Sequence, residues 1–467
     1  MQSRLNIEDI DQARADAAAH FWPHSQQAGN MTRESGVQLV TRGKGVWVED
    51  AEGERWFDTL SGLWLVNIGH GRREIADAVY RQMLELSFSP NDTVSPVTAA
   101  LSAKLATLSQ DERSRVYFTS GGSEANETAL KIAKNYHHLN GEPGRWKVLS
   151  RRGSYHGATL ACTSLGRGGP GGGSVPAQFG PLVPGNIHVA QVNHYQTDIC
   201  GRDGVCTLEC ARDIERAILH EGPSTVAAFI GEPISAAAGI HVPHPDYWPT
   251  VREICDRHGV LMIADEVITG FGRTGRMFAM EHWETKPDIF TCAKGLTSGY
   301  LPIGAAIATG KVADAFIGAG DQTFQHLITF GGNPASCAAA MANLEIMENE
   351  NMAARSQEMG DYLFEKLQDL RKHDIVGDVR GGKGLLCALE LVKDRGTHEH
   401  FPKSAKLDKL AVAAMRENRM LGRAGHIIPI APPLCIDRDE IDEAVARLDS
   451  VLSSLGATLS AHYTKGH

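Results

Sequence analysis

Short, uninterrupted apolar segments recur along the middle of the chain and alternate with stretches of helical periodicity. Strands that are covered on both faces of a sheet read as continuous apolar runs, whereas strands with one wet face alternate apolar and polar positions. The continuous runs lie at residues 116–118, 226–230, 260–264, 288–292 and 303–307. One intervening helix is expected to have an apolar face that ends at a glycine, with the residues Val251, Ile254, Cys255, His258 and Gly259. The pattern predicts an α/β fold with a mostly parallel central sheet.

Both ends of the chain depart from this pattern. Residues 46–57 are typical of a hairpin, and residues 379–392 are typical of strands around a Gly-Gly-x-Gly turn. Helical stretches are expected at 336–371 and 404–419. A last helix, from about Arg438, has one apolar stripe formed by Ile441, Val445, Leu448, Leu452 and Leu455. We therefore predict an N-terminal segment (1–60) that belongs to a small domain, a large domain (61–334) and a C-terminal small α+β domain (335–467).

The overall charge of the chain narrows the classes of partner. The 467 residues include 46 Lys and Arg against 56 Asp and Glu, a formal net charge of −10. An acidic chain repels phosphate backbones and anionic membranes, so we expect small molecules, and neither nucleic acid nor membrane, as partners. The N-terminus lacks the apolar core of a signal peptide, and no apolar run approaches the roughly 20 residues that span a bilayer. These features predict a cytoplasmic protein.

The nine cysteines are scattered, with one cluster at Cys200, Cys206 and Cys210. Its spacing, C-x5-C-x3-C, fits no common zinc motif. We therefore expect reduced, mostly buried thiols and no metal site.

The segment Val-Tyr-Phe-Thr-Ser-Gly-Gly-Ser, residues 116–123, runs from an expected strand into an expected helix. Glycines at Gly121 and Gly122 let backbone N–H groups approach an anion closely, and the helix N-terminus adds donors and the positive end of a dipole. Together with Ser123, these residues suit a phosphate group. A capped turn without any ligand would leave the same pattern.

Two charged residues follow buried strands further along the chain. Asp265 ends the run 260–264, and Lys294 follows the run 288–292. A buried carboxylate needs a cationic or hydrogen-bonding partner, which a protonated pyridine nitrogen, a nearby Arg or backbone N–H groups could each supply. Desolvation favours the neutral lysine amine, the form that attacks aldehydes. Because Lys294 lies 29 residues after Asp265, about one helix-and-strand unit, both can stand at the same edge of the sheet.

One glycine motif matches a dinucleotide-binding pattern, but its surroundings in the sequence do not fit that function. Residues 166–171 match G-x-G-x-x-G, but more Gly and Pro follow them and no helix pattern opens there. A dinucleotide-binding fingerprint needs strand, tight turn and helix in that order. We therefore interpret 166–185 as a glycine-rich loop near the mouth of an active site.

These segments together resemble the class III aminotransferases, which are fold-type I enzymes that use pyridoxal 5′-phosphate (PLP), and within them the pyruvate-dependent ω-transaminases. The resemblance extends from about Val40 to Leu455. Its motifs occur in the expected order: Gly-Leu-Trp-Leu-Val-Asn-Ile-Gly-His-Gly (62–71), Gly-Gly-Ser-Glu-Ala-Asn-Glu (121–127), Tyr-His-Gly (155–157), Gly-Glu-Pro (231–233), Asp-Glu-Val (265–267), Gly-Phe-Gly-Arg-Thr-Gly (270–275), Ala-Lys-Gly (293–295) and Ala-Pro-Pro-Leu (431–434).

The resemblance assigns a role to each matching residue. Lys294 would bind the aldehyde of PLP covalently and later move the proton between the substrate Cα and the cofactor C4′. Asp265 would pair with the pyridinium nitrogen. Val267 would pack on one face of the ring, Tyr155 would stack on the other, and Glu232 would belong to the polar wall. Singly, Tyr155 could be a packed core aromatic and Val267 an ordinary core residue.

The resemblance also implies how the phosphate is held and how chains associate. Gly121, Gly122 and Ser123 would bind it, and Thr329 matches the threonine that reaches it from a partner subunit. This implies a homodimer with shared active sites; a tetramer of two such dimers stays open. By itself, Thr329 could be a capping hydroxyl.

One departure from the family pattern bears on the keto acid. Relatives that use 2-oxoglutarate or ornithine carry an arginine where this chain has Pro429. Arg423, allowing one gap, matches the mobile arginine with which ω-transaminases pair the acceptor carboxylate; a surface loop arginine is the alternative. Trp64 matches a tryptophan of the substrate pocket, and Trp22 or Phe21 is a further candidate.

The resemblance therefore implies amino transfer from an ω-amino acid or amine to a keto acid, with pyruvate giving alanine. Taurine, β-alanine, diamines and aromatic amines all remain open as donors. The same fold also hosts aminomutases, racemases and decarboxylating transaminases. An alternative of another class is a catalytically silent, PLP-binding regulatory protein.

Overall fold

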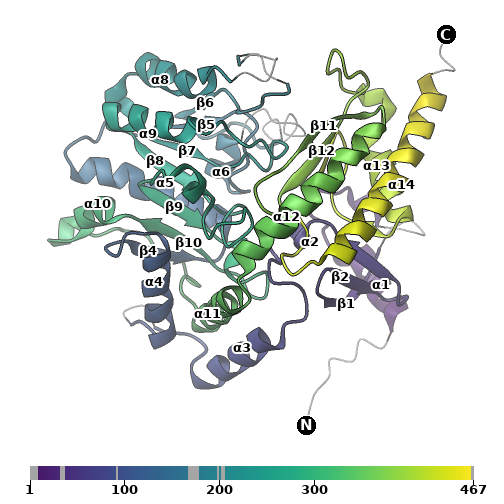
Figure 1. Ribbon diagram of the computed structural model, residues 1–467. Coiled ribbons are helices and arrows are strands. Elements are labelled where there is room, and N and C mark those ends of the chain that lie inside the picture. Colours follow the sequence, from purple (N-terminus) through teal and green to yellow (C-terminus); the bar gives the residue numbers. More distant parts are fainter. Residues whose placement is uncertain are drawn as a thin grey trace.

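A seven-stranded sheet forms the centre of the larger part of the molecule (Figure 1). The computed structural model describes residues 9–31, 37–90, 93–166, 178–196, 199–200 and 206–463. In spatial order the strands of the sheet are β4 (Arg115–Thr119), β10 (Gly304–Ala308), β9 (Ile289–Cys292), β8 (Leu261–Asp265), β7 (Val226–Gly231), β5 (Lys147–Arg151) and β6 (Asn186–Val189). Neighbouring strands from β9 to β6 are parallel, and β10 is antiparallel to both β4 and β9. The predicted mostly parallel sheet is confirmed.

Alternate residues of each central strand enter two different layers of core. Ala228 and Ile230 of β7 pack with α5 (Gly122–Leu139), whereas Phe229 packs on the other side with α8 (Glu209–Glu221) and α9 (Tyr247–His258). Burial on both faces explains why these strands read as continuous apolar runs. The predicted stop of α9 is confirmed, because Gly259 caps the helix in a left-handed conformation at φ 65°.

Two smaller sheets contain the other strands of the described residues. One is antiparallel and contains β11 (Val376–Arg380), β12 (Cys387–Leu391) and β14 (Ile427–Ile430). The other joins the predicted N-terminal hairpin to a strand from the C-terminal part, in the order β1 (Val40–Lys44), β2 (Trp47–Asp50), β3 (Arg55–Asp58) and β13 (Met420–Leu421). This pairing supports our assignment of residues 1–60 to the small domain, and we propose domain boundaries near residues 60 and 334.

The remaining helices are α1 (Ile10–His20), α2 (Ser61–Trp64), α3 (Arg73–Glu85), α4 (Pro96–Leu108), α6 (Leu160–Leu165), α10 (Gly310–Ala313), α11 (Pro334–Asn349), α12 (Met352–Gln368), α13 (Leu407–Glu417) and α14 (Arg438–Tyr463). The helical stretch predicted at 336–371 is interrupted at Asn351, whose φ of 49° ends one helix and starts the next. Asparagine tolerates this left-handed backbone better than most residues. Helix α11 packs against α3 and α4 of the larger part.

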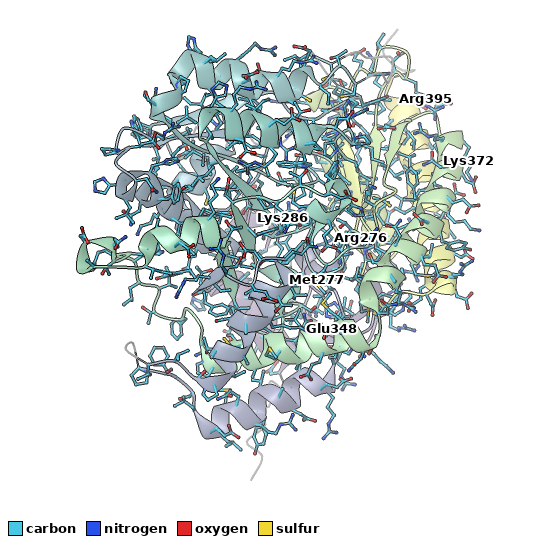
Figure 2. The ribbon with its side chains drawn as sticks, turned by 60° about the vertical axis from the view of Figure 1, so that its left-hand side comes forward. Arg276, Met277, Lys286, Glu348, Lys372 and Arg395 are labelled. Carbon is cyan, nitrogen blue, oxygen red and sulfur yellow. The ribbon has the colours of Figure 1, made fainter. Side chains whose placement is uncertain are left out.

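The two parts of the molecule lie side by side. Lys286 and Arg276 mark the larger part, and Lys372 and Arg395 mark the outer side of the smaller one (Figure 2). Of the helices that the structure describes, none combines the length and apolar character that crossing a bilayer requires.

Candidate active site

Asp265 stands at the carboxyl end of β8 and is 4% exposed. Its Oδ2 accepts a hydrogen bond from Nδ2 of Asn126 at 2.8 Å and lies 2.7 Å from Nδ1 of His156. The backbone N–H of Val267 donates to its Oδ1 at 3.1 Å. A buried carboxylate needs such partners, and this set holds the side chain in one orientation.

Lys294 follows β9 at the same edge of the sheet, as the offset of 29 residues predicts. The register pairs Asp265 with Thr291 of β9, which brings the ends of the two strands together. Lys294 has a φ of 40°, a left-handed conformation that a non-glycine residue adopts only where its surroundings hold it there. Burial lowers the pKa of the Lys294 amine to about 8; Asp265 and Glu232 raise the pKa, and Arg423 lowers it. The amine is therefore mostly protonated at pH 7, but it loses its proton at a lower pH than an ordinary lysine does.

The N-terminus of α5 faces this strand edge. A Cβ on Gly122 would lie 2.8 Å from Cγ1 of Val267, so glycine is needed for the close approach, whereas a Cβ on Gly121 would meet open space. The hydroxyl of Ser123 accepts a hydrogen bond from the N–H of Ala158 at 3.0 Å. Helix N-termini attract anions because their first N–H groups lack partners within the helix.

Glu232 and Tyr155 border the same space. Glu232 is 3% exposed, and its carboxylate accepts hydrogen bonds from the N–H groups of Tyr155 at 3.3 Å and Ala236 at 3.0 Å. Burial raises the pKa of the Glu232 carboxyl, and His156 opposes this shift. The Tyr155 side chain is 53% exposed, so its ring is free to contact a ligand.

These residues converge on a cavity of about 140 Å³. Its lining includes most of the predicted cofactor-binding residues, namely Gly122, Ser123, Tyr155, Glu232, Asp265, Val267 and Lys294. Residues from motifs that are far apart in the sequence therefore line one cavity.

The indole of Trp64 lies near two basic side chains. The Lys294 Nζ is 5.8 Å from the centre of the indole, and the Arg423 Cζ is 5.1 Å from it. Trp64 is 6% exposed and has a φ of 57°, and its Nε1 has no hydrogen-bond partner in the part of the chain that the structure describes. Arg423 is exposed. Two of the predicted substrate-binding residues, Trp64 and Arg423, therefore lie near the lysine.

Three other candidates, Thr329, Trp22 and Phe21, do not line this cavity within one chain. Thr329 is exposed and lines a separate groove of about 330 Å³ with Phe88 and Val94. Trp22 is 87% exposed and Phe21 54% exposed, and neither lines the cavity. Of the glycine-rich segment 166–185, residues 167–177 lie outside the described residues.

The sequence did not identify Asn126 and His156 as site residues, although they lie within the motifs at 121–127 and 155–157. Asn126 follows Gly122 by four residues, so the two lie on one face of α5, and His156 follows Tyr155 directly. Helical spacing alone could have identified Asn126 as a partner of the strand-end carboxylate. Leu63, which also lines the cavity, carries no such signal.

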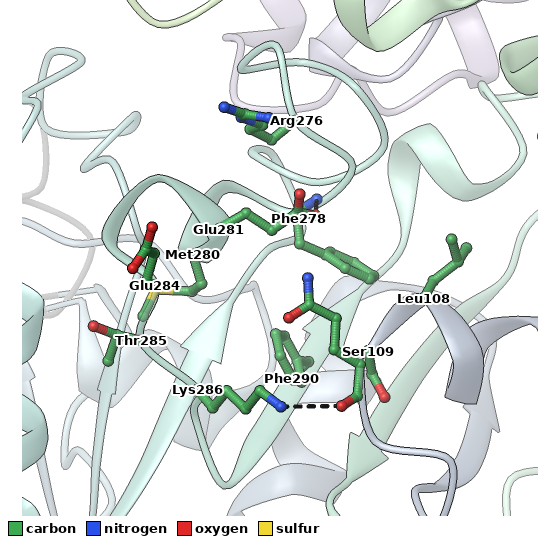
Figure 3. Close-up of a pocket in the computed structure, with 11 residues that line it drawn as sticks. Leu108, Ser109, Arg276, Phe278, Met280, Glu281, Glu284, Thr285, Lys286 and Phe290 are labelled. Carbon is green, nitrogen blue, oxygen red and sulfur yellow. Dashed lines mark hydrogen bonds between the residues drawn. The ribbon is translucent and has the colours of Figure 1, made fainter.

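A larger cavity, of about 450 Å³, lies next to the 3-10 helix Ala279–Trp283 (Figure 3). There the Nζ of Lys286 donates to the backbone oxygen of Gln110 at 3.1 Å, and Arg276 and Glu284 are exposed. None of the predicted site residues lines it. The cavity around Lys294 is therefore the candidate active site.

Known proteins resemble this chain over nearly its full length. Residues 30–452 match the family described as aminotransferase class-III. The chain is 36% identical to the putrescine–pyruvate aminotransferase of Pseudomonas aeruginosa, over 92% of this chain and 93% of that protein. It is 38% identical to the diaminobutyrate–2-oxoglutarate transaminase of Halomonas elongata, over 91% and 92%. A crystal structure of a thermostable (S)-enantioselective ω-transaminase from Thermomicrobium roseum matches with a TM-score of 0.89 and 40% identity, covering 95% of this chain and 98% of that one.

Proposed function

The chain belongs to the class III aminotransferases, a family of PLP-dependent enzymes, and from this premise we propose that it moves an amino group from an amine or ω-amino acid to pyruvate, giving alanine. The observation that carries the choice of acceptor is the position of Arg423. Its guanidinium and the Lys294 amine lie against the same indole ring, that of Trp64. A cation so placed suits a substrate whose carboxylate stands a short distance from the reacting carbon.

The residues at the strand edge fit PLP. The open space at Gly121 and the N-terminus of α5 suit a phosphate dianion, and the buried Asp265 carboxylate suits a protonated ring nitrogen. The lowered pKa of Lys294 suits an amine that must react with an aldehyde. When bound, PLP supplies an electron sink for the carbanion that forms at the substrate Cα.

The residues of this chain then have separable tasks. With the cofactor bound, the Lys294 amine would take the proton from the donor Cα and pass it to the cofactor carbon in the first half of the cycle, and in the second half it would carry a proton from that carbon to the Cα of the acceptor. Asn126 and His156 orient the Asp265 carboxylate through hydrogen bonds of 2.8 and 2.7 Å. Val267 and Tyr155 both line the cavity, where they would contact the cofactor ring. Because donor and acceptor use the same lysine in turn, ping-pong kinetics are expected.

Arg423 is suited to bind the acceptor only when a carboxylate is present. It forms no salt bridge within the described residues and is exposed, so its guanidinium can pair with a carboxylate without breaking an existing ion pair. Such a pair is charge-assisted and bidentate. A donor amine without a carboxylate leaves the guanidinium free to stay against Trp64 or in solvent.

Relatives of known acceptor include both a pyruvate enzyme and a 2-oxoglutarate enzyme. Pro429 stands where the resemblance expects the arginine of 2-oxoglutarate users, and in β14 it pairs with Ala388 of β12. Proline offers no cation for a second carboxylate. This favours pyruvate, which has one carboxylate, over 2-oxoglutarate, which has two.

A panel of amine donors, each tested with pyruvate and with 2-oxoglutarate, tests the proposal by measuring alanine and glutamate. We expect alanine to form and pyruvate to be preferred. The variant Arg423→Gln should raise the KM for pyruvate by roughly 10- to 100-fold, because a hydrogen bond to a charged group contributes about 1.5–3 kcal/mol. The matched control is Arg416→Gln, an exposed arginine of α13.

Four outcomes would count against the proposal. A preference for 2-oxoglutarate would refute the role of Arg423, and so would an equal change in KM for the Arg416→Gln control. An aminomutase or a racemase would release no alanine from pyruvate with any donor. A silent PLP-binding protein would form neither alanine nor glutamate.

We also propose a homodimer in which Thr329 reaches the phosphate of the partner's site. The groove around Thr329 is lined by exposed apolar side chains, with Val94 at 64%, Leu327 at 63% and Phe88 at 40% exposure. Contiguous apolar surface of this kind is typical of protein–protein contacts. The position of Thr329 outside its own chain's cavity is consistent with a role in the partner's site.

A further inference from the structure

The three cysteines that are clustered in the sequence also come together in space at the start of α8. The sulfurs of Cys200, Cys206 and Cys210 all lie within 4.8 Å of one another. Leu208, with a left-handed φ of 58°, turns the chain between Cys206 and the first turn of α8, which contains Cys210. Cys200 and Cys210 are 6% and 1% exposed, and Cys206 is half-buried. This thiol cluster has one member that a solute can reach.

The separation of the sulfurs suits metal ligands. Zinc bound by thiolates has Zn–S bonds of about 2.3 Å in tetrahedral geometry, which corresponds to sulfur–sulfur distances of about 3.8 Å. The cluster is thus within about 1 Å of a three-sulfur ligand set. A disulfide would join only two of the sulfurs and would give no reason for the third to be gathered beside them.

A buried cation adjoins the cluster. Arg151, at the end of β5, is 0% exposed and forms no ion pair with a carboxylate within the described residues. Its Nη2 donates to the backbone oxygen of Glu232, and its Nε and Nη1 have no hydrogen-bond acceptor at normal geometry there. The guanidinium interacts electrostatically with Cys210 and lies 5.6 Å from the ring centre of Trp248. Buried cations are stabilised by neighbouring negative charge; Arg151 interacts with the buried Glu232 carboxylate as well as with Cys210, so it can stabilise negative charge at the cluster too.

We propose that Cys200, Cys206 and Cys210 bind a thiophilic divalent cation, Zn²⁺, with its fourth coordination position open to a water or an added ligand. Three thiolates and Zn²⁺ carry a net charge of −1, which the Arg151 guanidinium would balance. Each thiol releases its proton to solvent when the metal–sulfur bond forms. The site is separate from the amino-transfer site, although Arg151 also contacts the backbone of Glu232.

Cobalt provides a visible probe of this site. The metal-free, full-length holoenzyme is titrated with Co²⁺, and absorption from thiolate-to-cobalt charge transfer is followed, with Zn²⁺ added at the end. We expect one equivalent per chain and complete displacement by Zn²⁺. Cys206→Ser should weaken binding by roughly tenfold or more, whereas Cys435→Ser, a half-buried cysteine outside the cluster, should leave it unchanged. Absence of the band, or equal binding by the Cys206→Ser variant, would overturn the proposal.

A second measurement needs no variant. The wild-type holoenzyme is treated with N-ethylmaleimide with and without Zn²⁺, and labelled peptides are quantified by mass spectrometry. Zinc should slow labelling of Cys206 at least roughly tenfold and leave Cys435 unaffected. Equal labelling of Cys206 under both conditions would overturn the proposal, as would a disulfide between two cluster cysteines in the enzyme as purified under reducing conditions. Amino-transfer activity enters neither measurement, so failure here is distinct from failure of the proposed function.

Discussion

Replacing Lys294 by methionine should stabilise the cofactor-free chain at neutral pH. Burial lowers the pKa of this lysine from 10.5 to about 8. One pKa unit corresponds to about 1.36 kcal/mol, so at pH 7, where the amine is mostly protonated in both states, the wild-type folded state bears a penalty of about 3 kcal/mol. The penalty falls as pH rises through 8 toward 10.5, because the unfolded chain then also loses the proton. At pH 10 it should be below about 1 kcal/mol.

Urea unfolding measures the difference in the free energy of unfolding between wild type and Lys294→Met directly. Both proteins are cofactor-free, at equal protein concentration, and are unfolded at several pH values from 7 to 10. The advantage of the variant should shrink by about 2 kcal/mol over that range. Lys406→Met, at an exposed lysine, is the control and should show no such trend. An advantage that does not change with pH, or a variant less stable than wild type at pH 7, would refute the assignment of Lys294 as a desolvated amine.

Two further predictions concern the phosphate site and the partner subunit. Gly122→Ala should destabilise the cofactor-free chain by about 1–3 kcal/mol, because the new Cβ would press on Val267 at 2.8 Å. Gly121→Ala should leave the free energy of unfolding unchanged and weaken PLP binding, which a titration measures. Equal stability of the two variants would contradict this prediction. Mixing Lys294→Ala chains with Thr329→Ala chains should restore one fully wild-type site per mixed dimer. The steady-state activity of the mixture should therefore exceed that of either variant alone. No gain on mixing would show that Thr329 belongs to the site of its own chain.

The central sheet could be predicted from the sequence because its strands are buried on both faces. Five of its seven strands coincide with continuous apolar runs. The other two, β5 and β6, were missed, since β5 ends in Ser150 and Arg151 and β6 begins Asn186-Ile187-His188. These polar residues form hydrogen bonds within the fold, for example from the Ser150 hydroxyl to the backbone oxygen of Leu165. Tertiary partners of this kind leave no local pattern.

The close approach of the three cysteine sulfurs could not be predicted from the sequence, for a related reason. Zinc motifs are recognised by short spacings, in which a tight turn brings two cysteines together. Here the turn at Leu208 and the packing of α8 bring Cys206 and Cys210 to Cys200. A left-handed leucine is rare, and no sequence rule predicts it.

The continuous apolar runs that reveal the sheet also account for the chemistry at its edge. The residues that follow a strand buried on both faces lie in low-dielectric surroundings. There Asp265 needs hydrogen-bonding partners, and the pKa of the Lys294 amine is lowered. The two residues were recognisable together because one cause, a buried parallel strand, positions both. Arg423 and Trp64 have no such common cause: one lies on an exposed loop after β13 and the other at a left-handed turn, and their contact depends on how the small domain packs. The proposed cofactor-binding residues at the sheet edge can therefore be predicted from the sequence, whereas the position of the residues proposed to bind the substrate depends on packing between the two parts.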